Sequence, residues 1–350
     1  MRFAFTDDQL AFREAVADLF AKRCTPDHVR AWWGDPQATV GESAVWHALA
    51  EMGVIGCTAP GAVGGLGFSL LDLEPLLEEA GRAALPEPLV DTTAVALHAL
   101  GGPTPRDRGI VGGWLDQIVA GELAVAVVGD RRLPVPGGET AGLLLALDGD
   151  RVVAIPGDAM AATPQPSVDG TRHLATVTWD SDAEVDLAVA DDGRRLAAEL
   201  RDRGAVATAA VLLGLGDTML AMTVAYVTER RQFGVPVGSF QAVKHHLADA
   251  LLRLELAKPV VRHAAAVLSG VPTDEGAGLA VEQTVAASMA KAAASDAAAL
   301  VARQALQCHG AIGYTVEHDL HLFMKRSWAL AESWGGAAWH RERIARQLLD

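Results

Sequence analysis

The chain opens with apolar residues at helical spacing. Phe12 and Val16 lie one turn apart behind a capping box at residues 6–9, which predicts an amphipathic helix. A second helix is expected from about Ser43 to Met52, and a third begins at a Ser69 cap and continues to about residue 80. Residues 1–120 are therefore predicted to form an N-terminal helical domain.

A glycine-rich segment, residues 61–67, lies just before the third helix. Such a loop can hold a phosphate at a helix N-terminus. Here no strand precedes the loop and no Lys-Ser or Lys-Thr pair follows it, so neither a P-loop nor a dinucleotide fingerprint fits. We interpret the segment as a structural turn.

The pattern changes to short β-type runs after about residue 121. Gly149-Asp150 separates two of these runs in the manner of a hairpin turn. The runs occupy residues 123–128, 143–147, 152–155 and 175–179. We expect a small middle β domain over residues 121–193.

The remaining sequence, residues 194–350, is helical again. The third helix of this part is very rich in alanine, and such small residues let helices approach closely, as in an antiparallel bundle. The expected helices span about residues 195–229, 239–269 with a Ser239 cap, 279–307 and 337–349. The predicted fold is mainly α with a small β domain, ordered as a helical domain, a β domain and a C-terminal four-helix bundle.

Composition excludes several classes of function. Of 350 residues, 50% are hydrophobic, which is enough for a sizeable core and excludes a disordered or fibrous chain. The 29 basic and 44 acidic residues give a net charge of −15, which disfavours nucleic acid and an anionic membrane as partners. The longest apolar stretch, residues 205–216, is too short to span a bilayer.

The cysteines and the first residues indicate the compartment. Cys24, Cys57 and Cys308 are far apart and odd in number, so we expect reduced thiols, no disulfide framework and no metal site. The first residues lead directly into charged positions, without the pattern of a signal peptide. We expect a cytoplasmic protein.

Two segments of the C-terminal part are specific enough to suggest a family. The first covers residues 229–249 and begins Glu229-Arg230-Arg231-Gln232-Phe233-Gly234. The second covers residues 307–322 and begins Gln307-Cys308-His309-Gly310-Ala311-Ile312-Gly313-Tyr314. Together they resemble the C-terminal domain of the acyl-CoA dehydrogenase family, and the α–β–α order and the early glycine-rich loop match that family too.

The resemblance implies an FAD enzyme that oxidises an acyl-CoA thioester to the 2,3-enoyl-CoA. In that family a glutamate removes the α-proton while the β-hydrogen leaves as hydride to the flavin. Part of the FAD pyrophosphate and adenosine is held by a neighbouring subunit.

The residues that serve a neighbour's FAD in this family can be matched to this chain. Arg230 matches the arginine on the pyrophosphate, and a guanidinium suits that role because it forks onto phosphate oxygens. The other matched positions are Gln232, Phe233, Gln241, Gln307 and Gly310. Two alternatives stay open: Arg230 as a solvated charge at a helix end, and Phe233 as a core residue. His309 is interpreted as structural.

The half of the site that would serve this chain's own FAD does not match the family. The two family positions for the catalytic glutamate fall on Trp334 and Gly204, so no catalytic residue is assigned, and Glu332 lies two residues before the first of them. Residues 336–338 lack the expected polar contacts, and residues 134–140 do not match the family's flavin loop.

The chain therefore matches the half-site for a neighbour's FAD but not the half-site for its own. In this it resembles the short, base-lacking subunit of actinobacterial α2β2 heterotetrameric steroid side-chain acyl-CoA dehydrogenases. The resemblance implies a larger partner subunit that carries the base and binds most of the acyl-CoA, with electron-transfer flavoprotein as a further candidate partner. One alternative is a homomeric flavoprotein with monooxygenase chemistry or a relocated base such as Glu332. A scaffold that has lost the cofactor is the other.

Overall fold

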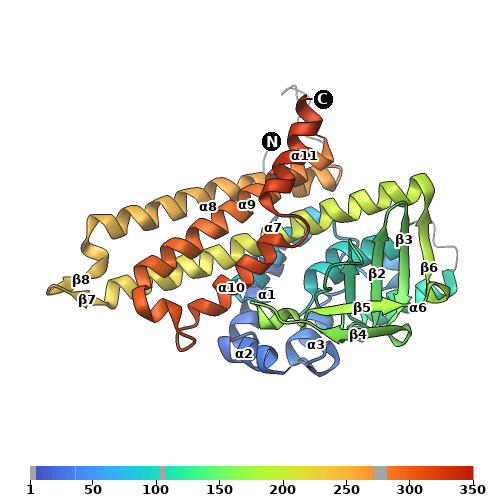
Figure 1. The fold of residues 1–350 in the computed structure, drawn as a ribbon, viewed down its shortest axis with the longest axis horizontal. Helices are drawn as coiled ribbons and strands as arrows, with labels where there is room; N and C mark the ends of the chain where they lie inside the picture. Colours follow the sequence, from blue (N-terminus) through green and yellow to red (C-terminus); the bar gives the residue numbers. More distant parts are fainter. Residues whose placement is uncertain (1–4, 36, 103–107, 272–281, 350) are drawn as a thin grey trace. The chain divides into compact units, whose positions relative to one another are not determined.

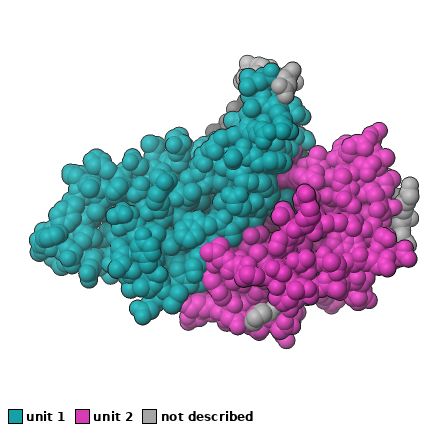
Figure 2. Space-filling model, viewed as in Figure 1, with its two compact units in different colours: residues 1–21, 74–85, 205–350 teal, residues 22–73, 86–204 magenta. Residues whose placement is uncertain are grey.

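In this computed structural model the described residues are 5–35, 37–102, 108–271 and 282–349. The chain runs through helices, then strands, then helices, as predicted (Figure 1). It divides into two compact units (Figure 2), one of residues 1–21, 74–85 and 205–350 and the other of residues 22–73 and 86–204. The predicted fold class, mainly α with a small β domain, is confirmed.

The first part of the chain is helical, and its helices start where the sequence places caps. The backbone N–H of Thr6 donates to Gln9 Oε1 at 2.8 Å, and that of Gln9 donates to Thr6 Oγ1 at 3.3 Å, which completes the capping box. Ser43 accepts from the N–H of Trp46 at 3.1 Å. The helices are α1 (Asp7–Arg23), α2 (Pro26–Gly34), α3 (Ala44–Glu51), α4 (Leu70–Arg82), α5 (Leu97–Leu100) and α6 (Arg108–Val119), with a π-helical segment at Val90–Ala96.

The glycine-rich segment is a structural turn, as expected. Gly64 has a φ of +82°, in the left-handed region that favours glycine. A Cβ atom on Gly65 would lie 2.0 Å from the carbonyl oxygen of Ala59, so the backbone itself fills this position. The loop is closed on its own chain.

The middle part forms two small sheets. In the four-stranded sheet, with order β1-β2-β3-β6, β1 and β2 are parallel and the other pairs are antiparallel. The predicted hairpin turn joins β2 to β3, with Gly149 at a φ of +62°. The strands are β1 (Val125–Val128), β2 (Leu143–Asp148), β3 (Arg151–Pro156) and β6 (Val185–Val189), and β4 (Met160–Pro164) pairs with β5 (Ala175–Trp179).

The described residues of the C-terminal part form five helices rather than the four predicted. They are α7 (Ala190–Glu229), α8 (Gln241–Leu268), α9 (Gln283–His309), α10 (Leu320–Glu332) and α11 (Ala337–Leu349). The Ser239 cap was wrong: Phe240 is the N-cap residue, and the Ser239 hydroxyl donates to the carbonyl of Pro236 at 2.7 Å. The expected start of the alanine-rich helix, residues 279–281, lies outside the described residues.

Helices α7 and α9 are long and apolar enough to cross a membrane by length and composition alone. In both, however, 72% of the apolar window is buried inside the fold, as in a core helix. Small side chains of α9, among them Ala287, Ala290 and Ala294, are fully buried. The apolar composition of these two helices is thus accounted for by packing.

Helices α4 and α7 touch backbone to backbone where they cross. A Cβ atom on Gly81 would lie 2.1 Å from the carbonyl oxygen of Val211, and one on Gly214 would lie 1.9 Å from that of Glu78. Real Cβ atoms do not approach a carbonyl so closely, so both positions require glycine. The crossing brings Arg82 and Asp217 together at 2.5 Å.

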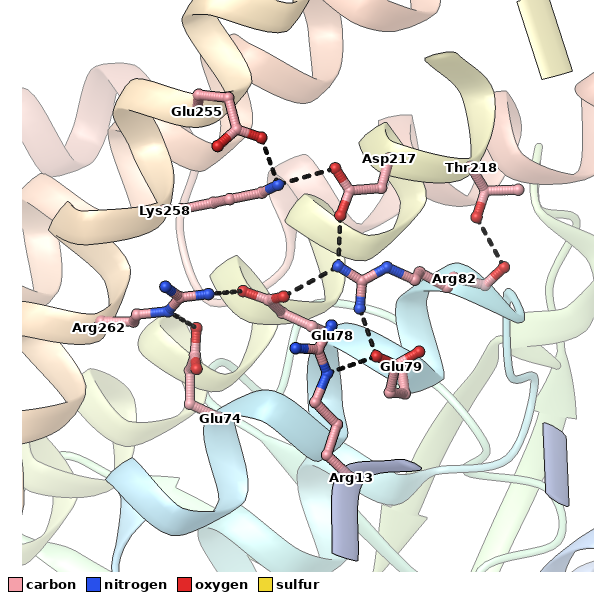
Figure 3. Close-up of polar contacts among 10 residues, drawn as sticks. All are labelled: Arg13, Glu74, Glu78, Glu79, Arg82, Asp217, Thr218, Glu255, Lys258 and Arg262. Carbon is pink, nitrogen blue, oxygen red and sulfur yellow. Dashed lines mark hydrogen bonds and ion pairs between the residues drawn. The ribbon is translucent and has the colours of Figure 1, made fainter. Parts of the chain in front are cut away.

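A network of charged side chains surrounds this crossing and joins α1, α4, α7 and α8 (Figure 3). Glu79 accepts from both Arg13 and Arg82, each at 2.6 Å. Asp217 also pairs with Lys258 at 3.1 Å, and Arg262 lies 3.5 Å from Glu78. Because Glu74, Glu78 and Glu79 of α4 are nearly inaccessible to water, these cations compensate charges that the surrounding helices would otherwise leave unpaired.

Glu74 is the least compensated acid of the network. Its side chain is 1% exposed, and neither carboxylate oxygen has a hydrogen-bond partner among the described residues. The nearest cation contact is Arg262 Nε at 3.8 Å. Burial, followed by the charge of Glu78, raises the pKa of Glu74 well above its ordinary value.

We predict that Gly214→Ala destabilises the fold by about 3 kcal/mol or more, because the added methyl group forces the two backbones apart. Denaturant unfolding measures the change. Gly112→Ala in α6 is the control, since a Cβ there meets nothing within 4 Å, and it should be neutral or stabilising by up to about 1 kcal/mol. Equal losses in the two variants would contradict a backbone contact at Gly214.

We predict that Glu74→Gln stabilises the protein at pH 8 by about 1 kcal/mol or more. Because the pKa of Glu74 is raised in the folded state, this carboxyl lowers the free energy of unfolding of the wild type only above the ordinary carboxyl pKa. There the unfolded chain ionises freely, whereas the folded chain does not. The gain should therefore grow with pH above about 4.5 and vanish below it. Unfolding curves at pH 4 to 8 check this, and a gain that stays constant across that range would contradict it.

Candidate functional site

A β-hairpin with a two-residue loop follows α7 and is part of the first motif. Its strands are β7 (Arg231–Gln232) and β8 (Val235–Pro236), and the loop residues Phe233 and Gly234 have φ values of +55° and +81°. Positive φ at both loop positions is the type I′ turn. Glycine adopts it freely, whereas for a phenylalanine it is a strained conformation of the kind that gathers at functional positions.

The hairpin directs Phe233 away from the protein core. Its side chain is 92% exposed, so the alternative of a core residue is wrong for this chain. The ring makes an edge-to-face contact with Phe240, with centroids 6.2 Å apart. An exposed aromatic side chain on a strained turn is suited to contact something outside the described residues of this chain.

Arg230 lies between the helix and the hairpin. Its N–H continues the helical pattern by donating to Tyr226, and its carbonyl accepts from Val237 at 2.8 Å, so the backbone is fixed on both sides. The side chain is exposed and makes no ion pair within the described part of the chain. Arg231, by contrast, belongs to strand β7, and Gln232 donates from its amide to the carbonyl of Arg231 at 2.8 Å.

A stacked pair of rings brings the second motif to the same end of the bundle (Figure 1). Tyr226, one turn before Arg230, stacks on His309 of α9 with centroids 4.5 Å apart. His309 is buried and donates from Nδ1 to the carbonyl of Ala305 at 2.8 Å. Burial lowers the pKa of His309, which keeps the ring neutral and suits a structural role.

All six residues assigned to the cofactor by resemblance are therefore exposed at one end of one unit. They are Arg230, Gln232, Phe233, Gln241, Gln307 and Gly310. Residues 230–248 contain three lysines or arginines and no acid, and Glu229 and Asp249 flank them on either side. The donor groups and the charge fit a diphosphate, and exposed glycine at 310 leaves room for close approach of a ligand.

The two family base positions hold no carboxylate. Trp334 follows α10 with a φ of +59°, and Gly204 is buried inside α7. Beside Gly204, the buried Arg203 donates from Nε to the carbonyl of Ala94 at 2.8 Å, in the π-helical segment, and burial lowers its pKa to about 10. Glu332 is exposed at the end of α10 in this chain, whereas α-proton abstraction needs a base shielded from water.

Lys291 is a buried polar group that the sequence reasoning missed. Its side chain is fully buried in α9, next to the turn that carries Trp334. Burial lowers its pKa to about 7. The signal was available in the sequence, because Lys291 is the one charged residue among residues 283–295 of the alanine-rich helix. A lone lysine on a helix that packs on all sides should have been singled out.

The segment in the region of the family's flavin loop, residues 134–140, is hydrogen-bonded within the β domain. Val135 exchanges backbone hydrogen bonds with Ala175 of β5, and Gly137 donates to the carbonyl of Arg172 at 2.8 Å. Just after β1, Arg131 pairs with Asp148 at 2.9 Å and with Glu184 at 2.8 Å. Val135, Gly137 and Arg131 thus have their partners within the β domain.

Comparison with known proteins finds relatives of this chain and solved structures with the same fold. Acyl-CoA dehydrogenase IpdE2 of Mycolicibacterium smegmatis is 31% identical over 345 residues, which cover 97% of this chain and 98% of that protein. The ChsE4-ChsE5 complex from Mycobacterium tuberculosis has the same fold, with a TM-score of 0.87 and 24% identity over 100% of this chain and 99% of that chain. The Tcur3481-Tcur3483 steroid ACAD gives a TM-score of 0.81 and 24% identity, with 97% of each chain covered.

The family assignment covers both ends of the chain. Residues 6–122 match the acyl-CoA dehydrogenase N-terminal domain, and residues 191–349 match the acyl-CoA dehydrogenase C-terminal domain. With the relative at 31% identity over nearly the full length of both proteins, these matches show that the chain belongs to the acyl-CoA dehydrogenase family.

Proposed function

We propose that this chain is the non-catalytic subunit of an FAD-dependent acyl-CoA dehydrogenase and that it completes the FAD site of a larger partner subunit. One observation carries the proposal: all six residues that would hold a neighbour's FAD are exposed at one end of the bundle, whereas both base positions lack a carboxylate. A chain that served only its own FAD would show the opposite pattern.

Each part of the pair has a defined task in this proposal. Bound FAD would accept the β-hydrogen of the acyl-CoA as hydride, and the base that takes the α-proton would come from the partner. In this chain, Arg230 would neutralise the diphosphate, and the amides of Gln232, Gln241 and Gln307 would bond the remaining polar edges. Phe233 would pack against the cofactor or the partner's surface, where burial would offset the strain of its backbone.

The assembly and the substrate class are further parts of the proposal. A heterotetramer with two copies of each subunit is supported by the shared fold with chains of the ChsE4-ChsE5 complex and the Tcur3481-Tcur3483 steroid ACAD. By the same analogy the substrate would be the CoA ester of a bulky steroid side chain, and electron-transfer flavoprotein would reoxidise the flavin in the cytoplasm. Likeness of fold, rather than residues of the site, supports the assembly and the substrate class.

The purified chain alone should bind FAD weakly and show no acyl-CoA dehydrogenase activity. A positioned general base contributes roughly 10²–10⁴-fold to a rate, so its absence should be evident in a standard assay. The flavin absorbance of the purified chain and turnover of acyl-CoA test the expectation. Stoichiometric FAD with normal turnover in the homomer would favour the alternative, a homomeric flavoprotein with monooxygenase chemistry or with a relocated base such as Glu332.

In the complex with its partner, Arg230→Ala should lower FAD content and lower activity in proportion. Loss of a charge-assisted contact to a buried opposite charge costs about 2–5 kcal/mol, so FAD should dissociate at least about 30-fold more readily. Added FAD should restore part of the activity, because the partner's base is untouched. Flavin absorbance per complex and turnover with and without added FAD are the measurements.

Two other arginines serve as matched controls for Arg230. Arg231→Ala removes a neighbouring charge that lies on strand β7, and Arg253→Ala removes an exposed charge on α8. Both should keep nearly full FAD occupancy. If all three variants lost FAD to the same extent, general surface charge rather than a specific Arg230 contact would explain the loss, and the proposed role would be wrong.

A further inference from the structure

Lys291 stands out among the buried titratable groups because no part of the proposed FAD site uses it. Its amino group lies at the C-terminal end of α10 and makes three hydrogen bonds. Nζ donates to the carbonyl of Ala331 at 2.7 Å and to that of Gly335 at 3.1 Å, and it lies 3.2 Å from Ser295 Oγ. Two of the three bonds therefore reach backbone carbonyls on either side of Trp334.

The turn that receives these bonds is strained and closely packed. Trp334 has a φ of +59°, and Gly335, at +100°, has no room for a side chain, because a Cβ there would lie 2.4 Å from Trp339 Cε3. On the other side, Nε2 of the buried His340 lies 3.1 Å from the carbonyl of Trp334. A tryptophan keeps a left-handed backbone only where its surroundings enforce it.

The surroundings of Nζ suit both protonation states of the amine. As an ammonium group, Lys291 donates to all three oxygens. As a neutral amine it can still donate to the two carbonyls while it accepts a hydrogen bond from the Ser295 hydroxyl, which can act as donor or acceptor. The contacts to the turn thus persist through a change of charge, which a simple ion pair would not allow.

We propose that Lys291 is a positioning residue that locks the α10–α11 turn, and with it Trp334, at the family's base position. This role of Lys291 rests on the proposed function only in that the Trp334 position is taken to be inactive. It also orients α11, which begins two residues after Gly335 and bonds to α9 through Arg343 Nη1 and Ser288 Oγ at 3.3 Å. Without the amine, the carbonyls of Ala331 and Gly335 would lose this shared donor.

Hydrogen exchange of the full chain without a partner tests the lock. In Lys291→Met, which keeps the length and apolar stem of the side chain, the hydrogen-bonded amides of Ser333 and His340 should exchange at least about 10-fold faster than in the wild type. The amides of α8 should keep their wild-type rates. Lys258→Met is the matched control, because that half-buried lysine pairs with Asp217 and Glu255 in α7 and α8 and should leave the turn unchanged.

Two further variants keep the test decisive if Lys291→Met does not fold. Ser295→Ala removes one of the three partners and should loosen the same amides by a smaller factor. Gly335→Ala disturbs the turn from the other side through its contact with Trp339. In the double variant Ser295→Ala with Gly335→Ala, the rise in exchange rate should be smaller than the product of the rises in the two single variants. The reason is that both changes act on one turn.

Hydrogen exchange measured over a range of pH distinguishes a Lys291 amine that holds the turn from a side chain that only fills space in the core. Burial lowers the pKa of Lys291 to about 7, from an ordinary value of 10.5 once the turn opens, so the open turn binds more protons between these values. Opening should therefore become less favourable from pH 6 to 9 in the wild type, after correction for intrinsic exchange, and stay flat in Lys291→Met. Glu332 of α10 and His340 of α11 are the titratable groups near the amine, and Arg343 of α11 lies near His340. Burial, followed by the charges of Lys291 and Arg343, lowers the pKa of His340 to about 4, outside this range.

Two results would overturn the inference. One is an unchanged exchange rate at Ser333 and His340 in Lys291→Met, and the other is a uniform rise over the turn and α8 together, which would show a general loss of stability. Failure of the proposed function would instead show in the FAD content of the Arg230→Ala complex, where a partner is present. The two failures are therefore measured on different samples and cannot be confused.

Discussion

The bundle depends on the close contact between α4 and α7, where Gly81 and Gly214 let two helix backbones touch. The contact is possible only because neither position carries a Cβ atom. It brings the acidic face of α4 to Arg82, Asp217 and the cations of α1 and α8, so charges that water would otherwise solvate are paired inside the protein. The long helix α7 is fixed by this contact, and its last turn carries the hairpin with Arg230.

Fixing α7 has a consequence at its far end. Because Tyr226 stacks on His309, the end of α7 and the end of α9 cannot separate without loss of an aromatic contact and exposure of a buried ring. The hairpin after α7 and the loop after α9 are therefore held side by side. A cluster of three rings, Tyr226, His309 and His318, joins these two segments.

The two family base positions are alike in a way that their sequences do not suggest. Arg203 lies next to Gly204 and Lys291 bonds to the residue after Trp334, so each position has a buried cation beside it and no carboxylate. Both side chains donate hydrogen bonds to backbone carbonyls. In each case a buried side chain stabilises the local backbone at a place where the family would carry out proton abstraction.

The sequence by itself determined the α–β–α order, the end of α7, the limits of α11, the β2–β3 turn and the two family motifs, whereas α7 begins at Ala190, five residues before its predicted start. These follow from local rules, such as caps, periodicity and turn chemistry, that involve neighbours in the chain. Helix α10 was missed because most of its sides are buried, which hides the helical period, and β4 and β6 because they are half exposed and lack clean alternation. Only the tertiary structure decided that Phe233 faces outward, that Lys291 bonds the Trp334 turn, and that the two motifs meet, because each depends on contacts between residues distant in the sequence.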